Sequence, residues 1–577
     1  MDTAMPANRP GVNESVAMRL ATAFRRHGVE IVFGQSIPSS FFLAAPQAGI
    51  RQATYRAENA GGTMADGYAR ISGRTGVVAA QNGPAATLLV PPLAEALKAS
   101  IPIVALVQDV ARDTTEKNAF QELDHLKLFD GCTKWARRID HASRVEEMVD
   151  LAFAQANGGR PGPVALILPA DLLTETARAA EKRQADLGRY PLDRSVADPA
   201  AVREAARLLA AARAPLVIAG GGVHASGACE VLAMLQEHGH LPVATTVMGK
   251  GAVAETHPLS LGVVGYFMGH GARGRALRPL VEEADVVLLV GNRANQNGTD
   301  SWKLYPQDAR YIQIDIDSTE IGRNYEALRL AGDAKLTLQA LHDAMLAEDL
   351  SHRANARSRM EARIREGVED WRRFTHHIRT NDREPIRPER VMQALENIID
   401  ADTIVAADAS YSSIWVANYL TAQRPGMRFL TPRGLAGLGW GLPLAIGAKL
   451  AAPARKVVCL AGDGGFAHTW AELETALRLK LDIPVVVLNN QILGYQKHAE
   501  DVIFGAHTEA CHFAPVDHAA IARACGCHGI RVERAADLDA ALQEAWQQDR
   551  PTVVDVITDP DARPPVTFYD NTYPSPF

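Results

Sequence analysis

The sequence predicts an α/β protein built from three doubly wound parallel-sheet domains. Short β-branched runs alternate with Ala- and Leu-rich stretches along nearly the whole chain. Near-continuous apolar strands separated by helices are typical of parallel sheets that are covered on both faces. At 577 residues the chain is too long for one core. Two charge-rich polar segments interrupt the pattern, so we expect an N-terminal domain over residues 1–185, a central domain over 195–350 and a C-terminal domain over 385–577.

The composition excludes several classes of protein. Apolar residues make up 47% and charged residues 22% of the chain, as in ordinary globular proteins. Sixty basic against 67 acidic residues leave no excess of positive charge to hold a nucleic-acid backbone. No apolar run reaches about 18 residues, so no membrane span is expected. Six cysteines are too few for a disulfide scaffold and no secretory signal is visible, so we expect a cytoplasmic protein.

The first two domains contain few chemical signals of their own. The strands expected in the N-terminal domain include residues 76–80, 102–107 and 163–168. Glu58 stands where a strand is expected to end and a helix to begin, and an acid is favoured there by the helix dipole. In the central domain, Gly220–Gly222 is a weak phosphate-loop pattern. Residues 351–388 are expected to form an exposed connecting helix and a linker.

The C-terminal domain contains a sharper pattern. Its expected elements are a strand at 456–461, a glycine turn at 462–465, a helix at 467–480 and a strand at 483–488 that ends at Asn489-Asn490. Such a βαβ unit places both strand ends on one edge of the sheet. The glycines would allow backbone N–H groups to face a phosphate, and Asp463 and Asn490 would offer oxygens to a hard cation such as Mg²⁺. A lone Gly-Asp-Gly would indicate a tight turn, but its spacing from Asn-Asn favours a phosphate and metal site.

Gly462-Asp463-Gly464, followed after a spacer of 24 residues by Asn489-Asn490, resembles the signature of the thiamine-diphosphate-dependent enzymes. The resemblance extends over nearly the whole chain and is closest to the acetolactate-synthase-like branch, in its large catalytic subunit. The other stretches that carry it include Arg56–Gly62, Asn82–Thr87, Arg160–Val164 and Leu438–Ala448. It implies a pyrimidine-binding N-terminal domain, a central domain of nucleotide-binding type and a pyrophosphate-binding C-terminal domain.

The resemblance also implies a set of cofactor-binding residues. Glu58 would hydrogen-bond the aminopyrimidine of thiamine diphosphate and promote its proton transfer, and Leu438 would be the wedge that bends the cofactor. Asp463, the side chain of Asn490 and the backbone carbonyl of Ile492 would bind Mg²⁺. The full cofactor-binding set is Glu58, Pro84, Gly437, Leu438, Gly462, Asp463, Gly464, Gly465, Asn490, Ile492, Gly494 and Tyr495.

By the same resemblance, Gln121 is expected to be catalytic together with Glu58. The predicted substrate residues are Gln35, Ser36, Gln121, Lys134, Arg293, Lys497 and His498. Gln121, Lys134 and Arg293 have the alternative of being ordinary surface residues. After Gly494, Tyr495-Gln496-Lys497-His498 replaces the Met-Val-x-Gln of acetolactate synthases, and the tryptophan that follows there is absent. Lys497 and His498 would therefore meet an anionic or hydroxylated substrate, or else face water.

The function implied is thiamine-diphosphate- and Mg²⁺-dependent decarboxylation of a 2-oxo acid followed by carboligation. Two alternatives stay open: a decarboxylase or C–C lyase acting on a sulfonated or CoA-linked substrate, and a non-catalytic paralogue that serves as a binding or regulatory subunit. FAD also stays open, because Asp315–Gly322 matches a stretch that holds FAD in relatives whereas Gly291–Asn295 departs from theirs. The family's arrangement implies a homodimer as the smallest active unit, and we expect a homotetramer.

Overall fold

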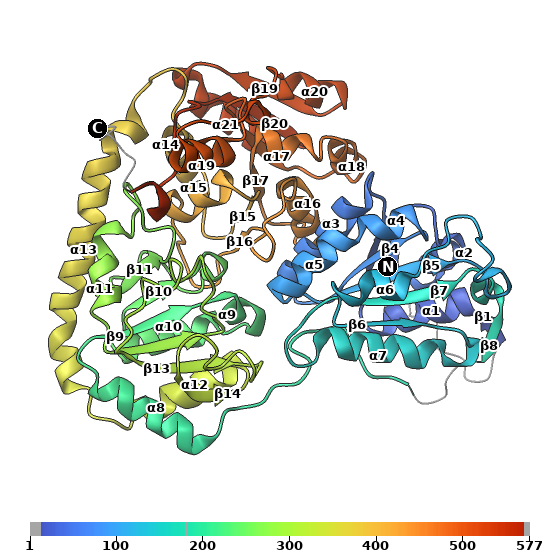
Figure 1. Ribbon diagram of the computed structural model, residues 1–577, viewed down its shortest axis with the longest axis horizontal. Helices are drawn as coiled ribbons and strands as arrows, with labels where there is room; N and C mark the ends of the chain where they lie inside the picture. The colour runs from blue at the N-terminus through green and yellow to red at the C-terminus, as the bar shows by residue number, and fades with distance from the viewer. Residues whose placement is uncertain (1–12, 179–182, 571–577) are drawn as a thin grey trace.

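The computed structural model describes residues 13–178 and 183–570. It contains three six-stranded sheets in which every strand pairing is parallel (Figure 1). The predicted architecture of three parallel α/β domains is therefore confirmed. No helix within the described ranges is long and apolar enough to cross a membrane.

The N-terminal sheet has its strands in the order β3 (Arg51–Ala53), β2 (Ile31–Gly34), β4 (Gly76–Ala80), β5 (Ile103–Asp109), β7 (Val164–Pro169) and β6 (Trp135–Arg138). Its helices include α1 (Val16–Arg26), α2 (Ser39–Ala44), α3 (Glu58–Ser72), α4 (Pro84–Leu88), α5 (Val90–Ala99), α6 (His125–Asp130) and α7 (Val145–Asn157). A separate antiparallel ribbon joins β1 (Asn13–Ser15) to β8 (Thr176–Arg178). These three-residue strands lack an apolar run, so the sequence pattern did not predict them.

The central sheet has its strands in the order β11 (Ser260–Val263), β10 (Val243–Thr245), β9 (Pro215–Ala219), β12 (Val286–Val290), β13 (Arg310–Asp315) and β14 (Ala327–Ala331). Its helices include α8 (Pro199–Ala211), α9 (Gly221–Ser226), α10 (Cys229–His238), α11 (Arg278–Glu282) and α12 (Ala334–Met345). In chain order this is the 3-2-1-4-5-6 arrangement of dinucleotide-binding folds, in which ligands bind where the strand order reverses.

The C-terminal sheet has its strands in the order β16 (Phe429–Leu430), β15 (Ile404–Ala407), β17 (Val457–Gly462), β18 (Pro484–Asn489), β20 (Thr552–Ile557) and β19 (His528–Val532). Its helices include α14 (Pro388–Glu396), α15 (Tyr411–Tyr419), α16 (Gly441–Ala451), α17 (Asp463–Ala467), α18 (Glu472–Arg478), α19 (Gly494–Phe504), α20 (His518–Ala524) and α21 (Leu538–Gln547). The single helix predicted over 467–480 is wrong. Helix α17 begins earlier, because extended Gly462 caps it and Asp463 suits the helix dipole, and a short interruption separates it from α18.

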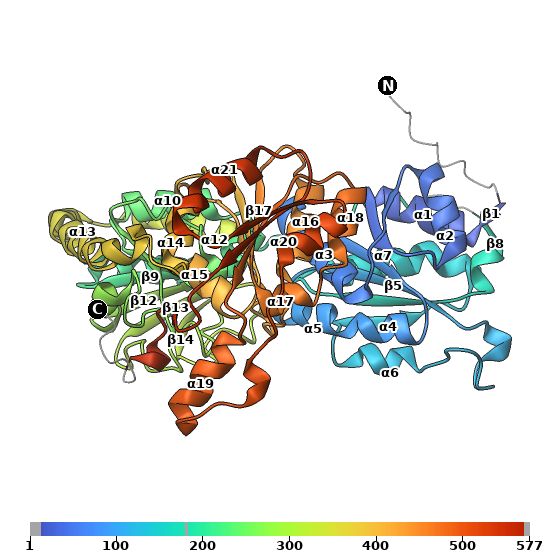
Figure 2. The ribbon, with the colours of Figure 1, turned by 90° about the horizontal axis from the view of Figure 1, so that it is seen from above.

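Helix α13 (Ser351–Thr380) forms the predicted connection between the central and C-terminal domains. It lies along the outer side of both domains (Figures 1 and 2). Its buried residues from the middle onward are spaced by three or four positions, as expected for a helix with one packed face: Ile364, Gly367, Trp371, Thr375 and Ile378. Most charged residues of the helix are exposed, which explains why this segment is rich in charge, whereas Arg353 is buried and donates to backbone carbonyls of the central domain.

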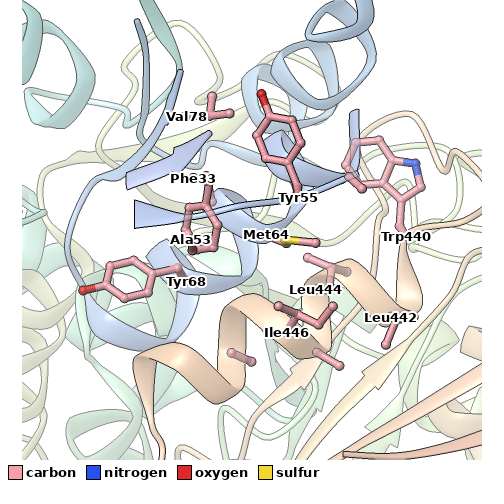
Figure 3. Close-up of a cluster of buried hydrophobic side chains, with 14 of the residues drawn as sticks. Phe33, Ala53, Tyr55, Met64, Tyr68, Val78, Trp440, Leu442, Leu444 and Ile446 are labelled. Atoms are coloured by element: carbon pink, nitrogen blue, oxygen red, sulfur yellow. The ribbon is translucent and has the colours of Figure 1, made fainter. Parts of the chain in front are cut away.

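The N-terminal and C-terminal domains of the chain share one hydrophobic core through α3 and α16 (Figure 3). A Cβ atom on Gly67 would lie 2.4 Å from the backbone of Leu444, and one on Gly447 would lie 2.0 Å from the backbone of Met64. Only glycine allows the two helix backbones to approach this closely. The contact fixes the carboxyl edges of the two sheets relative to each other.

Candidate functional site

The predicted metal residues come together at the carboxyl edge of the C-terminal sheet. Asp463 is the first residue of α17 and is only 6% exposed. Its carboxylate accepts a hydrogen bond from the backbone N–H of Gln491 at 2.9 Å. The side-chain oxygen of Asn490 accepts one from the backbone N–H of Ile492 at 3.3 Å. The ends of β17 and β18 thus bring a carboxylate, an amide and a peptide group into one loop cluster.

The glycines of this turn are required by close contacts. A Cβ atom on Gly464 would lie 2.8 Å from the Phe513 ring, and one on Gly465 would lie 2.2 Å from a carboxylate oxygen of Asp408. The turn therefore exposes backbone rather than side chains at the start of α17, which is the geometry that binds phosphate.

Burial raises the pKa of Asp463 to about 7, although N–H groups of Gly464 and Gln491 favour its ionised form. A divalent cation beside the carboxylate would oppose this shift. Within the described ranges, no group of three or more His, Cys, Asp or Glu side chains is arranged to hold a metal ion. A cation held here would thus need phosphate and water to complete its shell, as Mg²⁺ does. The residues present fit a Mg²⁺–diphosphate group.

A second carboxylate of this edge, Asp408, was missed by the sequence analysis. It follows β15, is 1% exposed, and accepts hydrogen bonds from the backbone N–H groups of Gly439 and Trp440, both at 3.0 Å. Burial raises its pKa. Asp408 thereby anchors the loop that carries Gly437 and Leu438, and the Leu438 side chain is partly exposed there. The signal that predicts it is an acid directly after the apolar run 404–407.

The carboxyl edge of the N-terminal sheet gathers another group of predicted residues. Glu58 begins α3 and is half-buried. The Gln35 side chain donates to the backbone carbonyl of Arg56 at 2.9 Å, so the loop after β2 contacts the segment before Glu58. The neighbouring Ser36 accepts a hydrogen bond at its carbonyl from Ser39.

Gln121 lies against the loop after β4. Its side-chain oxygen accepts from Gln81 at 2.7 Å, and its carbonyl accepts from Asn82 at 3.0 Å. Pro84 begins α4 at the end of the same loop. Gln121 and Pro84 therefore belong to the same edge of the sheet as Glu58.

Glu472, on α18 of the C-terminal domain, connects the two edges and was also missed. Its buried carboxylate accepts hydrogen bonds from the backbone N–H groups of Arg56 at 3.1 Å and Ala57 at 3.0 Å, and from the Thr475 hydroxyl at 2.7 Å. Burial raises its pKa. The two residues that precede Glu58 are thus held by the C-terminal domain of the same chain.

The side chains of three predicted substrate residues form hydrogen bonds within the protein. Lys134 donates to three backbone carbonyls at 2.6 to 3.0 Å, those of Gln155 in the last turn of α7 and of Gly158 and Arg160 after it. Arg293 donates to the Lys98 carbonyl. The ring nitrogens of His498 lie 2.8 Å from the Tyr411 hydroxyl and 3.1 Å from the Pro560 carbonyl, and burial lowers the pKa of this histidine to about 4. At neutral pH His498 is therefore a buried neutral side chain rather than a cation open to substrate.

Lys497 and Tyr495 lie at the start of α19, close to the metal residues. The Lys497 ammonium is 3.8 Å from both Asp501 and Asp561. The Tyr495 hydroxyl lies 2.9 Å from that of Tyr266, a residue of the central domain. Gly494 is buried, and a Cβ atom there would approach the Tyr411 ring to 3.0 Å. The start of α19 is thus packed tightly while the Tyr495 phenol stays partly exposed.

A cavity of about 180 Å³ lies between the three domains. It opens at the point where the order of the central strands reverses, between β9 and β12. Its wall includes the glycine turn Gly220–Gly222 and the cationic side chains Arg293, Arg428 and Arg433. The glycines, together with Arg293 and Arg428, fit the phosphate groups of a nucleotide.

Comparisons with known proteins agree with this geometry. The family model of the thiamine pyrophosphate enzyme N-terminal TPP-binding domain matches residues 14–128, that of the central domain matches 202–341, and that of the C-terminal TPP-binding domain matches 408–556. The three matches fall on the three parallel sheets.

Relatives cover nearly the whole chain. A probable acetolactate synthase large subunit of Methanococcus aeolicus is 33% identical over 573 residues, with 94% of this chain and 92% of the relative aligned. A second, of Methanocaldococcus jannaschii, is 31% identical with the same coverage. The large subunit of acetolactate synthase isozyme 3 of Escherichia coli is 31% identical, with 92% of each chain aligned. The chain therefore belongs to the thiamine pyrophosphate enzyme family, in its acetolactate-synthase-like branch.

Proposed function

We propose that this enzyme uses thiamine diphosphate and Mg²⁺ to decarboxylate a 2-oxo acid and to join the resulting fragment to an acceptor. The observation that carries the proposal is the meeting of buried Asp463, Asn490 and a glycine turn where β17 and β18 end. The names of the relatives support carboligation, because they are acetolactate synthases.

The C-terminal edge would hold the charged end of the cofactor. Asp463, the Asn490 side chain and the Ile492 carbonyl would bind Mg²⁺, and the start of α17 would face the diphosphate. Thiamine diphosphate supplies the electron sink that decarboxylation of a 2-oxo acid requires. Asp408 orients the loop of Leu438, so the wedge stays at a fixed height above the sheet edge.

The N-terminal edge would supply the proton chemistry. Glu58 would share a proton with the pyrimidine ring, which requires a carboxylate at a fixed position. Glu472 provides that position by holding the backbone of the two preceding residues. Gln35 supports the same segment from the other side, and Gln121 borders the space in front of it.

A homodimer is proposed as the smallest active unit, with Glu58 of one subunit facing Asp463 of its partner. Exposed apolar side chains near both edges support this arrangement, since large exposed apolar patches mark interaction surfaces. Phe120 is 84% exposed and Leu435 is 57% exposed. Helix α19 stands out from the body of the molecule and carries Phe504, which is 74% exposed (Figure 2). A tetramer would pair two such dimers.

The central cavity is proposed to hold a nucleotide, with FAD as the first candidate. The glycine turn after β9 and the wall cations Arg293 and Arg428 support a diphosphate-bearing ligand. The visible absorbance of the purified protein tests FAD directly. A colourless protein that binds ADP in calorimetry would assign the cavity to an adenine nucleotide without flavin.

A panel of 2-oxo acids tests the function as a whole. The purified enzyme with thiamine diphosphate and Mg²⁺ should release CO₂ and form a larger α-hydroxy ketone, identified by mass spectrometry. CO₂ release without ligation would favour the decarboxylase alternative, and activity confined to sulfonated or CoA-linked substrates would favour the lyase. No turnover with any substrate, despite bound cofactor, would favour the non-catalytic paralogue.

A further inference from the structure

Arg433 is a half-buried cation that forms no ion pair among the described residues. It lies three residues after β16 and directly before the loop that carries Leu438. One terminal nitrogen donates to the Ser413 hydroxyl, and Nε is buried without any hydrogen-bond partner. Across residues 13–178 and 183–570, no carboxylate forms an ion pair with it. The nearby carboxylate of Glu95 instead accepts from backbone N–H groups of the loop, including that of Gly434.

The surroundings keep this guanidinium charged, but no carboxylate of the described residues forms an ion pair with it. Burial lowers the pKa of Arg433 only to about 10, so the group is a cation at neutral pH. Its guanidinium carbon lies 5.2 Å from the centre of the Phe267 ring, which gives partial compensation through a cation–π contact. A partly desolvated cation whose buried Nε lacks a hydrogen-bond partner is costly, and a bound anion would lower that cost.

The position of Arg433 relates it to the reaction site rather than to the nucleotide turn. Ser413 belongs to the first turn of α15, which follows Asp408. The phenol of Tyr495, the carboxylate of Glu95 and the phenol of Tyr266 partly offset the lowering of its pKa, and Tyr495 follows Gly494 at the start of α19. The guanidinium therefore lies between two helix starts that flank the predicted diphosphate and metal residues. Arg293 and Arg428 line the same cavity but donate to the backbone carbonyls of Lys98 and Arg70.

We propose that Arg433 binds the carboxylate of the acceptor 2-oxo acid, while the Ser413 hydroxyl holds the guanidinium by accepting one of its hydrogen bonds. The inference rests on the proposed function and names a specificity-determining residue of that same site. A guanidinium matches a carboxylate because its planar fork donates two parallel hydrogen bonds. The Phe267 ring and the Tyr495 phenol would border the acceptor's side chain. The enzyme would thus select an anionic acceptor over an uncharged aldehyde.

The variants Arg433→Met and Arg433→Lys test this assignment with two acceptors. Pyruvate serves as donor, and either 2-oxobutanoate or benzaldehyde serves as acceptor, with products separated by mass spectrometry. For Arg433→Met, the 2-oxobutanoate concentration at half-maximal ligation should rise by about 10- to 100-fold, as expected for a lost charge-assisted bond. With benzaldehyde as acceptor, both CO₂ release and ligation should stay within about twofold. Arg433→Lys should lie between the wild type and Arg433→Met.

A second readout does not depend on turnover. Calorimetry with 2-hydroxybutanoate, a carboxylate that cannot react, should show binding to the wild type loaded with cofactor and metal, and a matching loss in Arg433→Met. Arg213→Met removes a guanidinium whose side chain is 92% exposed and should change neither assay. If Arg433→Met does not fold, the same comparison is made with Arg433→Lys, which keeps the charge but loses the fork.

Three results would overturn the proposal. The first is an unchanged 2-oxobutanoate dependence in a folded Arg433→Met or Arg433→Lys enzyme. The second is a parallel loss of CO₂ release with benzaldehyde as acceptor, which would show that Arg433 binds the donor pyruvate. The third is loss of nucleotide binding with normal ligation, which would show that Arg433 binds a phosphate of the nucleotide in the cavity. Failure of the wild type to release CO₂ from any 2-oxo acid would contradict the proposed function instead, and the calorimetric test of Arg433 would still decide the carboxylate site.

Discussion

The N-terminal and C-terminal domains have the same topology and different chemistry. Numbered in chain order within each domain, both sheets run 2-1-3-4-6-5, whereas the central sheet runs 3-2-1-4-5-6. In the C-terminal domain the strand edge carries a glycine turn, Asp463 and an amide, which suit phosphate and metal. In the N-terminal domain the equivalent edge carries Glu58 and neutral amides, which suit a heterocycle and a proton. One scaffold thus supplies two halves of a site, each with the residues that its part of the cofactor needs.

The largest expected effect comes from breaking the C-terminal half. Asp463→Ala removes the carboxylate that would neutralise the cation, so activity should fall to background and thiamine diphosphate affinity should fall with it. Calorimetry at limiting Mg²⁺ measures the affinity. Asp549→Ala, on a side chain that is 84% exposed, is the matched control. Normal cofactor binding by Asp463→Ala would contradict the role given to this edge.

Breaking the N-terminal half should separate binding from chemistry. Glu58→Gln keeps the size of the side chain but not its proton, so cofactor affinity should be retained while turnover falls by about 10²- to 10⁴-fold. Exchange of the cofactor's acidic C2 proton in D₂O, followed by NMR, should slow in parallel. Exchange at the wild-type rate would remove Glu58 from the catalytic role.

Mixing the two inactive variants tests whether the halves come from different subunits. After subunit exchange, random pairing makes half of the dimers heterodimers, each with one intact site. Activity should therefore recover to about a quarter of the wild-type value if the sites act independently. Native mass spectrometry confirms the exchange. If exchanged dimers stay inactive, each site is built within a single chain.

The pH dependence of metal binding should report on the C-terminal half alone. Burial raises the pKa of Asp463 to about 7, so below that pH a proton competes with Mg²⁺, and the apparent affinity should fall roughly tenfold per pH unit. The raised pKa also stabilises the metal-free fold at low pH, and this contribution is lost as the pH rises through about 7. Titration calorimetry and melting curves measure the two effects, and Asp463→Asn should show neither.

The smallest effect is expected at Glu472, which connects the N-terminal and C-terminal sheet edges. Glu472→Gln leaves one of the backbone N–H groups before Glu58 without a charged acceptor, so C2 proton exchange should slow by about three- to tenfold with cofactor affinity unchanged. Glu474→Gln, two positions along α18, removes only partly exposed ion pairs with Arg56 and Arg478 and should have little effect. Equal effects of the two changes would show that Glu472 has no special positioning role.

The sequence predicted what depends on local order along the chain. Apolar runs marked the strands, and the spacing of Asp463 and Asn490 indicated one sheet edge. Contacts between segments that are distant in the sequence were not predicted. The bond from Gly439 to Asp408 spans 31 residues and that from Ala57 to Glu472 spans 415. The shared topology of the two outer sheets was also invisible, because strand order leaves no repeat in the amino acids.

The side chains expected to reach substrate show a related limit. Lys134 and His498 have the chemistry of ligands, but in the structure backbone carbonyls and a phenol satisfy their polar atoms. Arg433 is the opposite case. Nothing in its local sequence distinguishes it from a surface arginine, so the sequence did not indicate it as a ligand. What distinguishes it is a buried Nε with no hydrogen-bond partner and the lack of an ion pair among the described residues. Residue type suggests what a side chain can do, and the packing decides whether it is available.

The glycine contacts between α3 and α16 have a consequence for building chimeric enzymes. Because Gly67 and Gly447 bring two helix backbones into direct contact, the shapes of the outer domains are matched to each other to within the size of a methyl group. An outer domain transplanted alone from a relative would bring its own helix spacing and would fit only by chance. The outer pair should therefore be exchanged together. The central domain is matched to the C-terminal domain in the same way, because a Cβ atom on Gly251 would lie 2.1 Å from the backbone of Met427 and one on Gly269 would lie 2.2 Å from the backbone of Val566.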